Sequence, residues 1–147
     1  MRFLILNGPN INFIGIREPN IYGKQNFKAL EKLAEDTCRE NGIECELYQS
    51  NHEGALIDRI QQAYMNTDGI VFNPGGYTHT SIAIMNALKA VGIPCVEVHI
   101  SDVDAREEFR KHSYIALASV KTIKGQGIDG YRQAILFLKD YLGRQQS

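Results

Sequence analysis

The stretch GIVFNPGGYTHTS, residues 69–81, indicates both the fold class and the place of a functional site. Gly69 and the apolar run Ile-Val-Phe are typical of a short strand buried on both faces in the middle of a parallel sheet. Asn-Pro-Gly-Gly then allows a sharp turn, polar side chains follow, and Thr80 or Ser81 can cap the next helix. Because ligands of open parallel sheets bind just beyond the carboxyl ends of the strands, we expect a site here.

The rest of the chain alternates between strand and helix signals. Short apolar or alternating runs predict further strands at residues 3–6, 43–49, 95–100 and 119–123. Apolar residues at helical spacing predict helical segments at residues 27–38, 51–64, 82–91, 105–111 and 131–142. Ser50 with Glu53, and Asp104 with Glu107, match the capping box that begins many helices. Five strands, each followed by a helix, predict an α/β fold with a parallel sheet and helices on both faces.

Size and composition indicate one compact cytoplasmic domain. The chain has 147 residues, of which 44% are hydrophobic and 22% charged, so we expect a single domain over residues 1–147. The absence of a secretory pattern and of a long apolar run predicts a cytoplasmic protein without a membrane partner. A net charge of −1 without a sustained basic stripe predicts no nucleic-acid partner. Cys38, Cys45 and Cys95 lack metal-ligand spacing and predict buried thiols rather than disulfides or metal ligands.

Polar side chains collect where three of the predicted strands end. They are Asn7, Asn10, Asn73, His79, His99, Ser101 and Arg110. Arg17 and Tyr22 lie on the long connection at residues 11–23, and loops of that length are often binding loops or lids. Taken singly, each of these residues except His99 and Arg17 has a more ordinary structural explanation. Their accumulation at one edge of the sheet favours a binding site.

Three long motifs resemble the signature segments of the type II 3-dehydroquinate dehydratase family. They are LILNGPNINFIGIREPNIYG at residues 4–23, NPGGYTHTS at residues 73–81 and EVHISDVDAREEFRKHSY at residues 97–114. The resemblance implies a flavodoxin-like three-layer sandwich with a sheet of order 2-1-3-4-5, and a homododecamer built as four trimers. It also implies dehydration of 3-dehydroquinate to 3-dehydroshikimate in the shikimate pathway, without a metal or another cofactor.

The family's reaction is an elimination that needs a base, a group that holds the enolate, and an acid. By resemblance, Tyr22 is the base, and Arg17 is the cation that can favour its phenolate. Asn10 would hold the enolate through an ordered water. His99 would give a proton to the departing hydroxyl, with its ring held by Glu97, which alternation along the strand places on the same face.

The resemblance also implies the substrate contacts. They are Asn73, Ser101 and the backbone amides of Ile100 and Ser101 for the carboxylate, and His79 and Arg110 for the ring hydroxyls. Arg106 matches the family's motif as well, and its role stays open between a part in the site and a structural pairing with Glu97 or a neighbouring carboxylate. Met85 and Asn86 stand where the family usually carries an Arg-Asp pair whose acid reaches the site of an adjacent subunit. We therefore expect Asn86 to face the neighbouring site as a neutral amide.

Other flavodoxin-like proteins fit these residues less well. A flavin- or nucleotide-binding protein needs a phosphate loop after the first strand, and the Asn-Gly-Pro-Asn at residues 7–10 lacks its hydroxyls. A phospho-receiver needs acidic residues where Asn7 and Asn73 stand. A small-molecule-binding module without catalysis is the alternative function, because the fold alone does not distinguish it, but it leaves the Tyr, Arg and His set unexplained.

Overall fold

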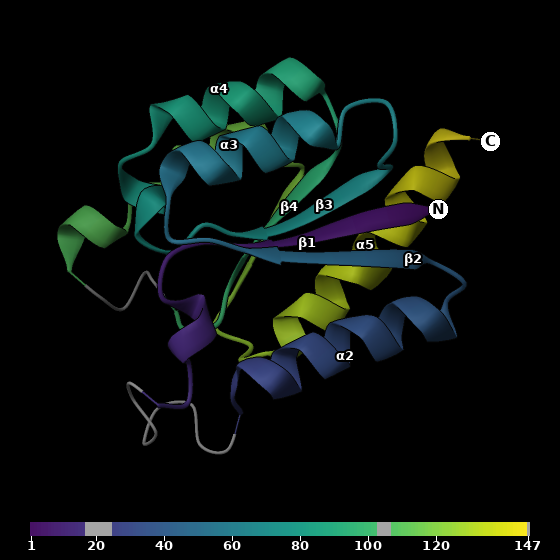
Figure 1. Ribbon diagram of the computed structural model, residues 1–147, viewed down its shortest axis with the longest axis horizontal. Coiled ribbons are helices and arrows are strands. Elements are labelled where there is room, and N and C mark those ends of the chain that lie inside the picture. The colour runs from purple at the N-terminus through teal and green to yellow at the C-terminus, as the bar shows by residue number, and fades with distance from the viewer. Residues whose placement is uncertain (17–24, 103–106, 147) are drawn as a thin grey trace.

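A five-stranded parallel sheet forms the centre of the protein, as seen in a computed structural model that describes residues 1–16, 25–102 and 107–146. Its strands lie in the order β2-β1-β3-β4-β5 (Figure 1). Their bounds are Arg2–Asn7 for β1, Glu44–Gln49 for β2, Gly69–Asn73 for β3, Cys95–His99 for β4 and Lys121–Lys124 for β5. All neighbouring pairs are parallel, so the predicted flavodoxin-like α/β fold is confirmed.

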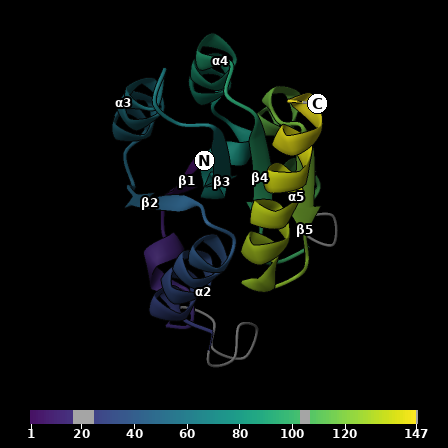
Figure 2. The same cartoon turned by 90° about the vertical axis from the view of Figure 1, so that its right-hand side faces the viewer.

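Helices cover both faces of this sheet (Figures 1 and 2). They are α2 (Phe27–Glu40) and α5 (Asp129–Gln145) on one face, and α3 (Glu53–Gln62) and α4 (Ile82–Val91) on the other. Successive residues of β1 feed the two layers, because side chains of a strand alternate between its faces. Phe3 and Ile5 pack with α2 and α5, whereas Leu4 and Leu6 pack with α3 and α4. This arrangement explains why β1 and β3 read as unbroken apolar runs.

The amino ends of two helices show which capping predictions hold. Ser81 caps α4, since its hydroxyl accepts a hydrogen bond from Ile84 N at 2.9 Å. The capping box of Ser50 and Glu53 was a wrong prediction: His52 is the N-cap of α3 and makes no side-chain cap bond. Instead, the Glu53 carboxylate accepts a hydrogen bond from the Ser81 hydroxyl at 2.5 Å, so a contact between helices replaces the local one.

The connection from β4 to β5 differs from the predicted strand-helix alternation. Its described residues form two short 3₁₀ helices, η4 (Glu108–Arg110) and η5 (Ile115–Ala118), and no α-helix. The predicted capping residue Asp104 lies outside the described residues. Glu107 is the N-cap of η4 and makes no side-chain cap bond to it.

The loops that follow β1 and β3 pack directly on each other. Gly8 N donates a hydrogen bond to Asn73 O at 2.8 Å, and a Cβ atom on Gly8 would lie 2.4 Å from Pro74 O. In return, Gly75 adopts φ +61° and a Cβ atom there would lie 2.8 Å from Pro9 O. Both contacts require glycine, and together they fix the edge of the sheet where β1 and β3 end.

We expect Gly8→Ala to lower the free energy of unfolding by about 1 to 3 kcal/mol, because the added methyl group overlaps backbone atoms that cannot rotate away. The matched control is Gly54→Ala in α3, where a Cβ atom meets nothing within 4 Å and alanine favours the helix. Urea unfolding of both variants provides the measurement. Equal stability of Gly8→Ala and the native chain would show that the two loops separate easily.

Candidate active site

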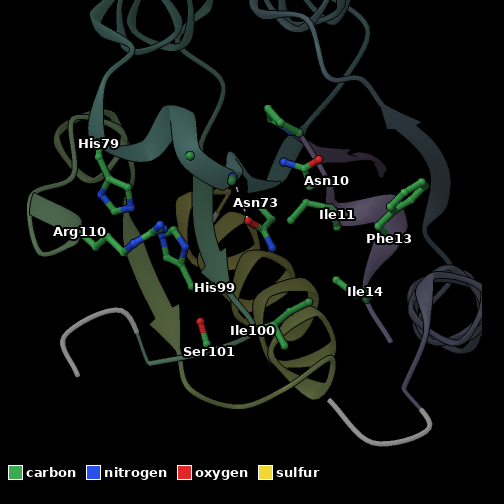
Figure 3. A pocket seen from close by; sticks show the side chains of 13 residues that line it. Asn10, Ile11, Phe13, Ile14, Asn73, His79, His99, Ile100, Ser101 and Arg110 are labelled. Atoms are coloured by element: carbon green, nitrogen blue, oxygen red, sulfur yellow. Dashed lines mark hydrogen bonds between the residues drawn. The ribbon is translucent and has the colours of Figure 1, made fainter. Parts of the chain in front are cut away.

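A cavity of about 250 Å³ opens at the carboxyl edge of the sheet, where the loops after β1, β3 and β4 meet (Figure 3). Seven of the predicted site residues line it: Asn10, Asn73, His79, His99, Ile100, Ser101 and Arg110. Its described lining holds one arginine and two histidines but no carboxylate. The cavity therefore favours a ligand that carries negative charge.

His99 and Glu97 form a buried pair at the end of β4. Nε2 of His99 lies 2.7 Å from Oε2 of Glu97, and the Glu97 side chain has no exposed surface. Burial alone would raise the pKa of Glu97, but hydrogen bonds and charge from its neighbours, above all His99, hold that pKa below its ordinary value. An ionised carboxylate can only accept, so Nε2 carries the proton and Nδ1 is the nitrogen left for a ligand.

The amide of Asn73 is oriented by the loop that follows it. Its Oδ1 accepts a hydrogen bond from Gly75 N at 3.1 Å (Figure 3). Because the oxygen is engaged, the side-chain NH₂ group is the part of Asn73 that can donate to a ligand in the cavity. This geometry suits recognition of a carboxylate oxygen.

His79 and Arg110 line the same cavity from segments outside the sheet (Figure 3). Nδ1 of His79 lies 2.7 Å from the His112 carbonyl oxygen and must donate to it, which leaves Nε2 as the free ring nitrogen. Nε of Arg110 lies 2.8 Å from Glu107 Oε2, and its guanidinium stacks 5.1 Å from the centre of the Phe109 ring. Both side chains are thus held by residues that do not belong to the described lining of the cavity.

The loop after β1 supplies Asn10 and an apolar wall. Asn10 adopts a left-handed conformation with φ 69°, which Asn tolerates better than most residues, and its backbone N–H donates to Asn51 Oδ1 at 3.1 Å. Ile11, Phe13 and Ile14 line the cavity beside it and were not predicted as site residues. The available signal was an apolar cluster, Ile-Asn-Phe-Ile, inside a loop, where polar residues are usual.

The described lining of this cavity does not include Glu97, which contacts His99 behind it. Tyr22, Arg17 and Arg106 lie outside the described residues, so their predicted places stay predictions. Asn86 is exposed on α4 and does not line the cavity of its own chain. Any contact of Asn86 with a site therefore requires a second subunit.

Neither the cysteines nor other metal-ligating side chains gather at a site in the described part of the chain. Cys38 and Cys95 are buried free thiols as predicted, whereas Cys45 is partly exposed. No group of three or more His, Cys, Asp or Glu residues suited to hold a metal ion occurs among the described residues.

Tyr131 of α5 links the ends of β1 and β3 beneath the cavity. Its hydroxyl donates to Asn7 Oδ1 at 2.6 Å, and Asn7 is the register partner of Asn73. Complete burial raises the pKa of Tyr131, although a hydrogen bond with Asn73 acts in the opposite direction. The phenol therefore stays neutral and holds both asparagines in place.

The fold and this cavity define a flavodoxin-like α/β protein with a histidine–carboxylate pair at the carboxyl edge of its sheet. The family model described as dehydroquinase class II matches residues 1–139, and the chain belongs to this family.

Individual relatives extend this assignment over the full chain. A 3-dehydroquinate dehydratase of Carboxydothermus hydrogenoformans is 50% identical over 147 residues, covering 100% of this chain and 96% of that protein. The crystal structure of a type II dehydroquinase from Butyrivibrio crossotus matches with a TM-score of 0.92 at 54% identity, over 95% of this chain and 97% of that chain. A 3-dehydroquinate dehydratase-like protein from Bifidobacterium longum matches with a TM-score of 0.73 at 26% identity, over 97% and 98% of the two chains.

We expect Tyr131→Phe to lower the free energy of unfolding at neutral pH by about 1 to 3 kcal/mol, because Asn7 loses its buried donor. The pKa of Tyr131 is higher in the folded state than the ordinary phenol pKa of about 10. The stabilisation by its neutral hydroxyl is therefore fully present below a pH of about 10 and is lost as the pH rises through the pKa of the folded state.

The difference between Tyr131→Phe and the native chain should therefore narrow in alkaline solution, and denaturant unfolding across a pH series measures it. Tyr64→Phe is the matched control, since Tyr64 is 57% exposed. A Tyr131→Phe variant as stable as the native chain at neutral pH would contradict the structural role of the hydroxyl.

Proposed function

We propose that this chain is a type II 3-dehydroquinate dehydratase, a lyase that removes water from 3-dehydroquinate to give 3-dehydroshikimate in the shikimate pathway. The family assignment and relatives at about 50% identity support the activity. The observation that carries the chemistry is the buried His99–Glu97 pair, which presents one ring nitrogen at a cavity that favours an anion.

The reaction requires a proton to leave the carbon between the ketone and the carbon that bears the hydroxyl. The electron pair of that C–H bond forms an enolate, and its return expels the hydroxyl as the C–O bond breaks. In our proposal His99 supplies the proton that turns the departing hydroxyl into water, through Nδ1. Glu97 holds Nε2 and so keeps the ring turned towards the substrate.

Tyr22 is the proposed base, and Arg17 is the cation that favours its phenolate. These two assignments rest on the sequence motif at residues 4–23. Their loop begins close to the substrate site, because Ile14, only three residues before Arg17, lines the cavity. Asn10 is proposed to stabilise the enolate through a water, as a neutral amide that can donate without taking up the proton.

The carboxylate of the substrate is proposed to bind Asn73, the Ser101 hydroxyl and the backbone amides of Ile100 and Ser101. The Asn73 NH₂ group has two N–H bonds, so beside its hydrogen bond with Tyr131 one N–H remains for the carboxylate. His79 and Arg110 then meet the ring hydroxyls, and the fixed tautomer of His79 makes Nε2 an acceptor for one of them.

The function is tested by adding 3-dehydroquinate to the purified chain in the presence of a chelator and following the ultraviolet absorbance of the conjugated enone. We expect absorbance to rise at pH values between about 6 and 9. Binding of the substrate without any rise would instead identify a small-molecule-binding module.

In the same assay we expect Tyr22→Phe to lower kcat by about 100-fold or more while KM changes little, because proton transfer is made only in the transition state. Tyr64→Phe, at the opposite edge of the sheet, is the matched control. Unchanged turnover of Tyr22→Phe would remove Tyr22 as the base.

We also propose that the chain acts in the cytoplasm as a homododecamer of four trimers in which Asn86 faces the site of an adjacent subunit. Its exposure on α4 supports a role outside its own chain. In the described part of the chain, no helix is long and apolar enough to cross a membrane. An amide in place of the family's usual carboxylate still donates and accepts hydrogen bonds but pairs more weakly with cations.

We expect Asn86→Asp to change KM by a few-fold at most and Asn86→Leu to raise it more, because leucine removes both hydrogen-bonding groups. Kinetics with light scattering on the same samples provide the measurement. If Asn86→Leu keeps native kinetics and native mass, Asn86 is ordinary helix surface and the contact between subunits is refuted.

A further inference from the structure

Two hydroxyl groups hold the Glu97 carboxylate from the side away from the substrate cavity. Ser113 Oγ donates to Glu97 Oε2 at 2.7 Å, the same oxygen that His99 Nε2 contacts at 2.7 Å. Thr122 Oγ1 donates to the other oxygen, Oε1, at 2.9 Å. Within the described residues the carboxylate thus has three donors, and only one of them is the acid proposed for the reaction.

The fold aims both hydroxyls at Glu97. Thr122 on β5 is the register partner of Glu97 on β4, so the two side chains lie next to each other on one face of the sheet. Ser113 precedes η5, and its Oγ accepts a hydrogen bond from Ala116 N at 3.0 Å. A hydroxyl carries a single proton, so once its oxygen is oriented by Ala116 that proton is directed to Glu97.

Neither hydroxyl touches the substrate cavity. Ser113 and Thr122 line a second cavity of about 200 Å³, and His99 and Arg110 are part of both linings. The direct route from these two hydroxyls to the reacting groups is their hydrogen bonds to Glu97. This separates them from the residues proposed to bind substrate.

The surroundings of Glu97 determine which partner of the pair carries the proton. Among the described residues, the other charged or titratable groups near the pair are Cys95 on β4, His79 after β3, Arg110 at the end of η4, Lys111 after η4, and Lys124 on β5. Burial acts against the ionised form of Glu97, whereas hydrogen bonds from His99, Ser113 and Thr122 lower its pKa. Hydroxyl donors favour a carboxylate over a carboxylic acid, because the ionised group has more lone pairs to accept with.

We propose that Ser113 and Thr122 are positioning residues that keep Glu97 ionised and aligned on Nε2 of His99. The imidazole then keeps its Nε2 proton, while Nδ1 carries the proton that the departing hydroxyl receives. Without the two donors, the Nε2 proton moves across the hydrogen bond to Glu97, and the Nδ1 proton then sits on a neutral ring that gives it up far less readily. This role rests on the proposed function, in which His99 is the acid.

The kinetic test uses Thr122→Val and Ser113→Ala, which remove one donor each with little change in shape. Each should lower kcat at neutral pH by about tenfold, the effect of one hydrogen bond to a charged group, while KM stays within about twofold. The acid limb of the kcat profile should move up by about one pH unit, because Glu97 protonates sooner. Thr122→Ser keeps the hydroxyl and should keep the native profile.

Ser119→Ala is the matched control for the same segment. Its hydroxyl donates to Ile115 O at 2.8 Å and not to Glu97, so its removal should leave the acid limb unchanged. If this control and the two variants show equal losses of kcat without any shift of the acid limb, the two hydroxyls are merely structural and the proposal is overturned.

A second readout does not depend on turnover. The carboxyl ¹³C resonance of Glu97, assigned by its disappearance in Glu97→Gln, is titrated in the native chain and in each variant without substrate. Its midpoint should rise in Thr122→Val and Ser113→Ala and stay in place in Ser119→Ala. If the Glu97 midpoint is unchanged in folded Thr122→Val and Ser113→Ala, the proposal is refuted. If the midpoints shift as expected but the native chain does not dehydrate 3-dehydroquinate, only the proposed function is refuted.

Discussion

The contact between the loops after β1 and β3 is the constraint on which the site depends. These strands lie side by side, yet the chain leaves them for opposite sides of the sheet, and this divergence makes room for a cavity at their carboxyl ends. The close contacts of Gly8 with Pro74 and of Gly75 with Pro9 join the two loops at the base of that cavity. Because backbone meets backbone there, the side chains of Asn10 and Asn73 are placed by rigid neighbours rather than by flexible ones.

The fold was predictable because its strongest signals are local. Unbroken apolar runs mark strands buried on both faces, and Ser81 caps α4 with atoms only three residues away. The capping box at Ser50 failed where a distant partner competed, since the Glu53 carboxylate binds the hydroxyl of Ser81 instead. A local sequence pattern shows which hydrogen bonds a side chain can make. The packing of α3 against α4 determines which of them Glu53 makes.

The site was predictable to the extent that its residues follow strand ends. Alternation along β4 predicted that Glu97 and His99 share a face, and the family resemblance predicted that they pair. The apolar wall around Phe13 escaped prediction because apolar residues in a loop give no sign of what they face. Ser113 and Thr122 escaped it because hydroxyls are common, and only the register of β4 with β5 and the turn into η5 bring them to one carboxylate.

The hydrogen bond from Tyr131 to Asn7 also bears on when the site can form. Its partners are 124 residues apart, so nearly the whole chain must be synthesised before α5 can dock beneath the ends of β1 and β3. Until then Asn7 lacks its buried donor, and the edge of the sheet that bears the cavity is incomplete. A contact of such sequence separation forms late, because the chain must first lose the entropy of closing that loop. A ribosome-bound fragment that contains every described residue of the cavity lining but not α5 would therefore still lack Tyr131, which holds Asn7 in place beneath the cavity.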